Sequence, residues 1–214
     1  MKLSRWFAAV AVVGSLTLGS SAQAVTYKVS IDTSAISGTV AQLALDFIDG
    51  GPLSNSVLVT SFTTDGTLGA SLSAGGVAGT LPGVVTLTDS AFFSELLTEM
   101  TLGNSLLFLF DPSASPPDPG SLPDAFTVYL LDVVTGLPLF DTTDPTSANA
   151  LFQFDIDGSR LGALTPYAAP GGAVTLSVTR APSPVPEPSV FLLLSLGLAG
   201  IYLHGRLKSR ETSV

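Results

Sequence analysis

The sequence has no cysteine and a single histidine, His204, which lies close to the C-terminus of the 214 residues. Without cysteine the protein forms no disulfide, no thiolate nucleophile and no cysteine-ligated metal site. Catalysis by an activated serine needs a base, and the chain before His204 offers no histidine for that role. Histidine-based zinc and iron sites are excluded there for the same reason. We therefore predict no catalytic residue, no cofactor and no bound metal, and we expect that the protein is not an enzyme.

Basic residues are also scarce, because the chain has 8 Lys and Arg against 17 Asp and Glu. Five of the 8 lie in the two terminal segments, so residues 25–184 hold only Lys28, Arg160 and Arg180 against 15 acidic residues, a net charge near −12. Nucleic acids need basic partners for their phosphates, so we predict no nucleic-acid partner. The negative charge permits binding of divalent cations, but simple repulsion between exported molecules explains it as well, and we favour that interpretation.

The N-terminus has the pattern of a secretory signal peptide. Lys2 and Arg5 precede an apolar stretch at residues 6–19, and two alanines in A-x-A spacing follow. We predict a signal peptide at residues 1–24; an uncleaved anchor is the alternative. The residues of the predicted cleavage site are Ala22, Ala24 and Val25.

The C-terminal segment has three parts: a proline motif, an apolar run at residues 190–203 and a basic tail at residues 204–214. The prolines fix φ near −65° and lack backbone donors, so the motif stays extended and accessible. The apolar run enters lipid as a transmembrane helix, and the basic residues favour the cytoplasmic side. The residues concerned are Val185, Pro186, Glu187 and Pro188 in the motif, and Arg206, Lys208 and Arg210 in the tail.

These three parts, in this order, resemble the PEP-CTERM sorting signal, in which Pro-Glu-Pro precedes a transmembrane helix and a short basic end. The resemblance implies that an exosortase, a membrane transpeptidase of Gram-negative bacteria that also make exopolysaccharide, processes the tail. The protein would then be a membrane-anchored precursor that reaches the cell surface or the extracellular space. A plain C-terminal anchor on a proline-rich stalk is the alternative.

The apolar run is short for a permanent anchor. Its fourteen residues cover about 21 Å as a helix, whereas the hydrocarbon core measures about 30 Å. Arg206 and Lys208 must therefore snorkel to the headgroups to complete the span. This margin favours an anchor that is held only until the motif is processed.

Between the terminal segments, apolar and polar residues alternate in many short stretches separated by Gly, Pro and Asp. We predict an all-β ectodomain over residues 25–180, an antiparallel two-sheet sandwich of jelly-roll or immunoglobulin-like type, followed by a Pro/Ser-rich stalk at 181–189. The strand order stays open. The predicted strands are 25–32, 40–48, 57–64, 68–72, 84–88, 106–110, 125–134, 137–140, 151–156 and 173–179.

One short helix is expected at residues 89–100. Asp89 offers a cap, and apolar residues then recur at helical spacing; they are Phe92, Phe93, Leu96, Leu97 and Met100. The stretches 27–34 and 79–83 resemble the ectodomain of a recurring group of PEP-CTERM proteins with no established activity.

Carboxylate pairs are the remaining candidates for a site, because two carboxylates hydrolyse glycosides without histidine. The pairs close in sequence are Asp46 with Asp49, Glu95 with Glu99, and Asp155 with Asp157, and the aromatic residues left free for sugar stacking are Tyr129 and Tyr167. Asp155 and Asp157 also begin like a calcium loop but lack its later ligands. We read them as a turn; a surface Ca²⁺ shared with Asp144 is the alternative.

The sequence therefore predicts an exported structural or interaction protein of the exopolysaccharide or biofilm matrix. Its predicted partners are an exosortase, the membrane through the C-terminal helix before processing, and exopolysaccharide. A carbohydrate- or calcium-binding surface module is the alternative, and an acid-pair glycosidase ranks third.

Overall fold

A computed structural model describes residues 25–51, 54–113, 121–157 and 162–181. These residues form β-strands and one 3₁₀ turn, η1 (Ser34–Ile36). The strands are β1 (Tyr27–Asp32), β2 (Val40–Ile48), β3 (Ser56–Thr64), β4 (Thr67–Ala74), β5 (Gly76–Ala78), β6 (Val85–Thr88), β7 (Phe93–Thr101), β8 (Ser105–Pro112), β9 (Asp124–Asp132), β10 (Phe152–Ile156), β11 (Ala163–Pro166) and β12 (Thr175–Arg180).

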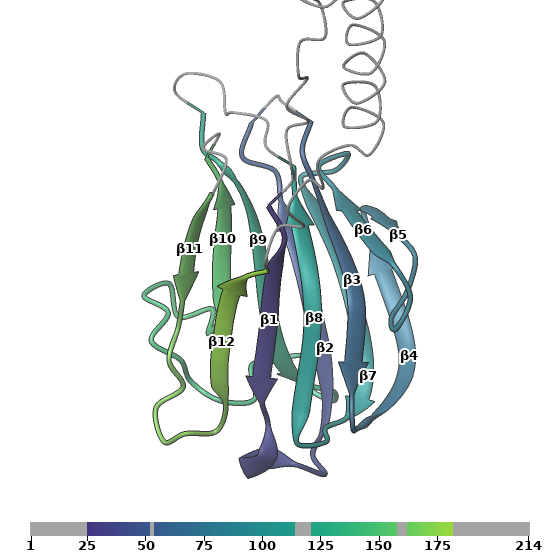
Figure 1. Ribbon diagram of the computed structural model, residues 1–214, viewed down its shortest axis with the longest axis vertical. Coiled ribbons are helices and arrows are strands. Elements are labelled where there is room, and N and C mark those ends of the chain that lie inside the picture. Colours follow the sequence, from purple (N-terminus) through teal and green to yellow (C-terminus); the bar gives the residue numbers. More distant parts are fainter. Residues whose placement is uncertain (1–24, 52–53, 114–120, 158–161, 182–214) are drawn as a thin grey trace, which may run out of the picture. The chain divides into compact units, whose positions relative to one another are not determined.

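The strands form two six-stranded antiparallel sheets that pack face to face (Figure 1). Sheet A has the order β12-β1-β8-β3-β6-β5, and sheet B has the order β11-β10-β9-β2-β7-β4. The predicted all-β antiparallel sandwich is confirmed. The predicted signal peptide, sorting motif, membrane helix and basic tail lie outside the described residues, and no helix within the described residues is long and apolar enough to cross a membrane.

The strand pairing is nested. β1 pairs with β8, β2 with β7 and β3 with β6, so the first three strands meet strands 6 to 8 in reverse order. Successive pairs alternate between the sheets, as they do when one long antiparallel ribbon is rolled into a sandwich. This is the jelly-roll arrangement, and it decides between the two predicted topologies. After β8, strands β9 to β11 extend sheet B beyond β2, and β12 returns to sheet A beside β1.

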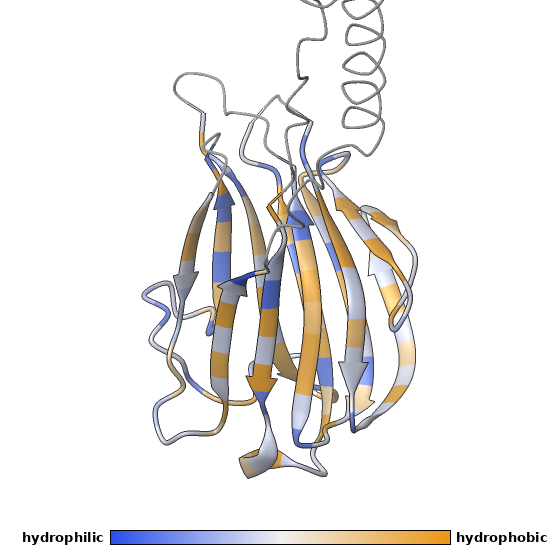
Figure 2. Cartoon of the chain, viewed as in Figure 1, coloured by the Kyte–Doolittle hydropathy of each residue, from blue (hydrophilic) through white to orange (hydrophobic). Residues whose placement is uncertain are grey.

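Alternation along each strand supplies the core between the sheets (Figure 2). On β2, the side chains of Ala41, Leu43, Leu45 and Phe47 point inward and are buried. β8 repeats the pattern, and most of the remaining strands contribute two or more buried apolar side chains. Burial of this layer, at about 25 cal/mol per Å² of apolar surface, is the main stabilising term for a chain without disulfides.

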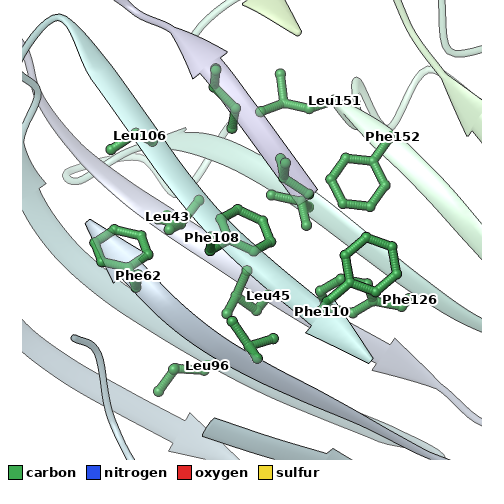
Figure 3. Close-up of a cluster of buried hydrophobic side chains, with 14 of the residues drawn as sticks. Leu43, Leu45, Phe62, Leu96, Leu106, Phe108, Phe110, Phe126, Leu151 and Phe152 are labelled. Atoms are coloured by element: carbon green, nitrogen blue, oxygen red, sulfur yellow. The ribbon is translucent and has the colours of Figure 1, made fainter. Parts of the chain in front are cut away.

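Five aromatic side chains join the two sheets within this core, and Figure 3 shows three of them, Phe110, Phe126 and Phe152. The ring of Phe110 on β8 lies 5.0 Å from Tyr27, 5.3 Å from Phe126, 5.8 Å from Phe152 and 5.3 Å from Phe154, measured between ring centroids. Each such pair adds about 0.5–1.5 kcal/mol beyond its buried area. Phe110 and Tyr27 come from sheet A and the others from sheet B, so the cluster fixes how the sheets face each other.

The expected helix at residues 89–100 is wrong, because this segment contains β7, which pairs with β2 along its full length and with β4 on its other side. Leu96 and Met100 fit both a helical and a strand period, and the other inward positions of β7, Ser94 and Thr98, are polar. Ser94 Oγ donates to the Thr88 carbonyl oxygen (2.8 Å), and the Thr98 hydroxyl is hydrogen-bonded to that of Ser71 (3.0 Å). Hydrogen-bond partners on other strands thus satisfy these two inward hydroxyls. Their polarity conceals the alternation of apolar and polar residues that would have marked β7 as a strand.

Smaller differences concern the edges of the sheets. The expected strand at 137–140 is reduced to a single bridge between Leu131 and Pro138. The short edge strands β5 and β11 were not predicted, since neither carries a regular apolar alternation. The first and last strands of the sandwich lie side by side, because Tyr27 pairs with Arg180 and the Ala181 N–H donates to the Thr26 carbonyl oxygen (2.8 Å).

Candidate functional site

A row of polar side chains crosses the outer face of sheet B at right angles to its strands. Register places Asp46 of β2 between Glu95 of β7 and Thr127 of β9, and continues the row through Gln153 of β10 to Thr165 of β11. Four steps between neighbouring strands at about 4.8 Å each give this row a length of about 19 Å. We call these five residues the polar row.

Two mostly apolar rows flank the polar row on the same face. On one side Leu97, Ala44 and Tyr129 lie in register, with Leu72 of β4 beside Leu97. A second row on the other side contains Phe93, Ile48 and Ala125 and continues to Asp155 of β10. Leu72 is 66% exposed and Phe93 is 39% exposed, whereas Ala44 is fully buried. The face therefore presents exposed apolar side chains around a buried centre.

The centre of the polar row is buried although it belongs to an outer face. Asp46 is only 8% exposed and Thr127 only 3% exposed. Asp46 Oδ1 and Thr127 Oγ1 are both buried and make no hydrogen bond of standard geometry. Burying such an atom without a partner costs about 1–3 kcal/mol, so native proteins rarely keep it without a reason.

The two carboxyl groups at one end of the row, those of Asp46 and Glu95, have raised pKa values. Burial, and secondarily the charge of Glu95 directly across the strands, raises the pKa of Asp46 to about 7. Burial also raises the pKa of Glu95. Among the described residues the basic side chains are Lys28 on β1 and Arg180 on β12, both in sheet A. The described part of sheet B thus supplies no countercharge to this pair.

Two tyrosines lie near the acidic groups. Burial raises the pKa of Tyr129, the interaction of its hydroxyl with the Thr127 side chain opposes this rise, and the charge of Asp46 adds to it. The pKa of Tyr167 is raised by burial and then by the charges of Asp144 and Asp155. These are the two aromatic residues that the sequence left free for sugar stacking.

None of the three carboxylate pairs predicted from the sequence forms the site. Asp49 accepts a hydrogen bond from the Gly51 N–H (2.9 Å) in the turn after β2. Glu99 lies opposite Gln42, whereas Glu95 lies opposite Asp46. The structure brings Asp46 and Glu95 together instead, from two strands that are distant in the sequence. The available signal was the carboxyl of Asp46 inside the apolar run of β2.

In the third predicted pair, Asp155 with Asp157, the carboxyl of Asp155 makes a hydrogen bond to a residue of its own strand. Asp155 Oδ1 accepts from Gln153 Nε2 (2.7 Å), and burial raises the pKa of Asp155. Asp144 accepts from the N–H and hydroxyl of Thr146 (2.9 and 2.7 Å), and such hydrogen bonds hold its pKa below the usual value although burial opposes them. Within the described residues no group of three or more His, Asp or Glu could hold a metal ion, so the calcium alternative gains no support from Asp144, Asp155 and Asp157.

Comparison with known families finds the PEP-CTERM protein-sorting motif at residues 184–208. The match covers the predicted motif from Val185 to Pro188, the apolar run, and Arg206 and Lys208 of the tail. No curated protein and no solved structure matches the chain. The motif is the signal that an exosortase recognises, and it supports an exported protein at the cell surface or outside the cell.

Proposed function

We propose that the protein is a structural or interaction component of the exopolysaccharide or biofilm matrix, delivered there by exosortase processing of its tail. The observation that carries this proposal is the sorting motif at residues 184–208. An A-x-A site at the N-terminus supports export, because a chain with both signals is translocated first and processed at its C-terminus afterwards.

The jelly roll suits a body that is held at one end. Its first strand begins where its last strand ends, because Tyr27 pairs with Arg180 and the Ala181 N–H donates to the Thr26 carbonyl oxygen. The core contains no cysteine and needs no oxidant to fold. A net negative charge adds solubility outside the cell. In this role the protein acts by attachment and binding.

Sorting is tested with Glu187→Ala in a host that carries the cognate exosortase. We expect the wild-type chain to lose the residues after the motif and to appear in the medium or the polysaccharide fraction, whereas Glu187→Ala remains full length in the membrane. Intact mass of the purified protein reads both cleavage points and any attached group. Edman sequencing should begin at Val25.

Glu211→Ala is the matched control, because it removes the same side chain from the tail beyond the matched residues. We expect it to be processed like the wild-type chain. If wild type and Glu187→Ala both remain intact in the membrane, the tail is a plain anchor and the sorting proposal fails. If the processed protein stays in solution after the exopolysaccharide has been removed by precipitation, the matrix role fails while sorting stands.

A further inference from the structure

We propose that the free edge of β12 is a self-association surface, on which the β12 strand of a second copy of this chain pairs in antiparallel orientation and joins two copies of sheet A. This inference goes beyond a matrix role, because it names a partner and a surface, and it holds whether or not the tail is processed.

The first argument is that β12 is the least protected of the four edge strands. It ends sheet A, and in the described part of the chain no strand pairs with its other side (Figure 1). Its six residues pair with β1 in one unbroken register. The other edges are blunted: β5 has three residues, β11 has four and ends at Pro166, and the register of β4 shifts between Leu68 and Ser71. The unpaired N–H and C=O groups of an open edge are free to bond a further strand.

The second argument is that the sequence of β12 is complementary to itself. From Thr175 to Thr179 it reads Thr-Leu-Ser-Val-Thr, nearly the same in both directions. We therefore place Ser177 opposite Ser177 of the second copy, which puts Thr175 opposite Thr179. Hydroxyl pairs of this kind are favourable between strands.

The same pairing covers apolar surface. It places Leu176 of one copy opposite Val178 of the other, on the side of the strand that faces the core. Both side chains are only half-buried where they pack against the core of the single chain. Removing their remaining apolar surface from water favours association.

The third argument is charge. Residues 25–184 have a net charge near −12, so two copies repel each other over most of their surfaces. Lys28 on β1 and Arg180 on β12 are the basic side chains of the described residues. The two strands hold them against a single acidic residue, Asp32. This edge is therefore the part of the described surface where a second acidic copy is repelled least.

The charges of β1 also match across the proposed pairing. Lys28 lies beside Thr179, and Asp32 lies beside Thr175. With Ser177 at the centre, Lys28 of one copy falls in the same row as Asp32 of the other, three strand spacings or about 14 Å away along the joined sheet. The twofold symmetry of the pair repeats this arrangement. Such complementarity orients the second copy in antiparallel register.

The experiment measures the oligomeric state of the full-length chain in detergent by sedimentation velocity at micromolar concentrations. We expect an equilibrium between monomer and dimer. Ser177→Lys places like charges opposite each other at the centre of the pairing and should raise the dissociation constant of the dimer about tenfold or more. Ser73→Lys is the matched control, because Ser73 is exposed on β4, an edge strand of the other sheet. It should leave the dimer unchanged.

A wild-type chain that stays monomeric overturns the proposal. A dimer that neither variant weakens, that both weaken equally, or that Ser73→Lys weakens more, overturns it as well and assigns the association to another part of the chain.

Crosslinking tests the register. The chain has no cysteine, so a single introduced thiol can crosslink only to another copy. Residues directly opposite in an antiparallel pair have Cβ atoms about 4.5–5.5 Å apart, close to the separation in a disulfide. We expect Ser177→Cys to give a covalent dimer with a mild oxidant or a short bis-maleimide, whereas Ser73→Cys stays a single chain. Equal crosslinking of the two variants would show chance collision and would overturn the pairing through β12.

Discussion

The outer faces of the two sheets differ in how far their polar side chains are buried. On sheet A the outward side chains of β1, Lys28 and Asp32, are exposed, and β12 places hydroxyl residues beside them. On sheet B the outward carboxyl of Asp46 is buried, and a second carboxyl lies directly opposite. Solvating polar side chains on an outer face costs little, whereas burying one without a partner lowers stability. Sheet A also contains one such atom, because Asp111 Oδ1 on β8 is buried without a hydrogen-bond partner. Asp111 lies opposite Leu58, whereas Asp46 lies opposite Glu95, so the facing carboxyl is what sets sheet B apart.

The largest expected effect tests this difference through stability against pH. The pKa of Asp46 is about 7 in the fold and 3.8 when unperturbed. Between these two pH values the folded chain therefore keeps a proton on Asp46 that the unfolded chain has released. The free energy of unfolding should therefore fall as pH rises from about 4 to about 7, by about 4 kcal/mol at 1.4 kcal/mol per pH unit. In Asp46→Asn this loss disappears, so the variant is the more stable chain at about pH 8.

Urea unfolding of both chains at several pH values measures this effect. Parallel pH profiles for wild type and Asp46→Asn would contradict the buried, proton-holding state of Asp46.

A smaller effect separates burial from charge repulsion within the pair. Burial is the main cause of the raised pKa of Asp46 and the charge of Glu95 the lesser one. Glu95→Gln should therefore lower the pKa of Asp46 only partly, and should stabilise the fold above neutral pH by about 0.2–1 kcal/mol, the size of a cross-strand like-charge effect.

The pKa of Asp46 is read from the pH dependence of its carboxyl carbon in NMR spectra. Glu99→Gln is the matched control, because Glu99 lies on the same face of the same strand but opposite Gln42. Equal pKa values for Asp46 in the two variants would show that the Glu95 charge does not act on it.

The smallest effect has the opposite sign and belongs to a loop. Asp65 Oδ1 accepts hydrogen bonds from the backbone N–H groups of Asn104 (2.8 Å) and Ser105 (2.9 Å), and these lower the pKa of Asp65 to about 2. Its stabilising contribution is complete above pH 3.8 and is lost as pH falls toward 2. Asp65→Asn should therefore melt below the wild type near pH 5, by a margin that shrinks on acidification. A margin that is constant with pH would contradict this assignment.

Much of the fold could be predicted from the sequence, because a strand with one buried face shows an alternation of apolar and polar residues. Nine of the predicted strands correspond to strands of the structure, including the buried β2 and β8. β7 was not predicted as a strand because its inward positions include the polar residues Ser94 and Thr98. Their hydrogen-bond partners, Thr88 and Ser71, lie on other strands. The pair of Asp46 and Glu95 was not predicted for a related reason: the two residues are far apart in the sequence and meet only through the pairing of β2 with β7.

By itself the sequence determined that the chain has no cysteine and a single histidine, and it determined the sorting motif and the alternating pattern, since composition and local periodicity need no partner strand. Tertiary structure alone decided the nested strand order, the strand state of residues 93–101 and the burial of Asp46 opposite Glu95. These depend on register between segments far apart in the chain, and a shift of one residue would turn each of these side chains to the other face. The pKa of Asp46 therefore belongs to the fold, because the burial and the facing charge that raise it exist only after the sheets have formed.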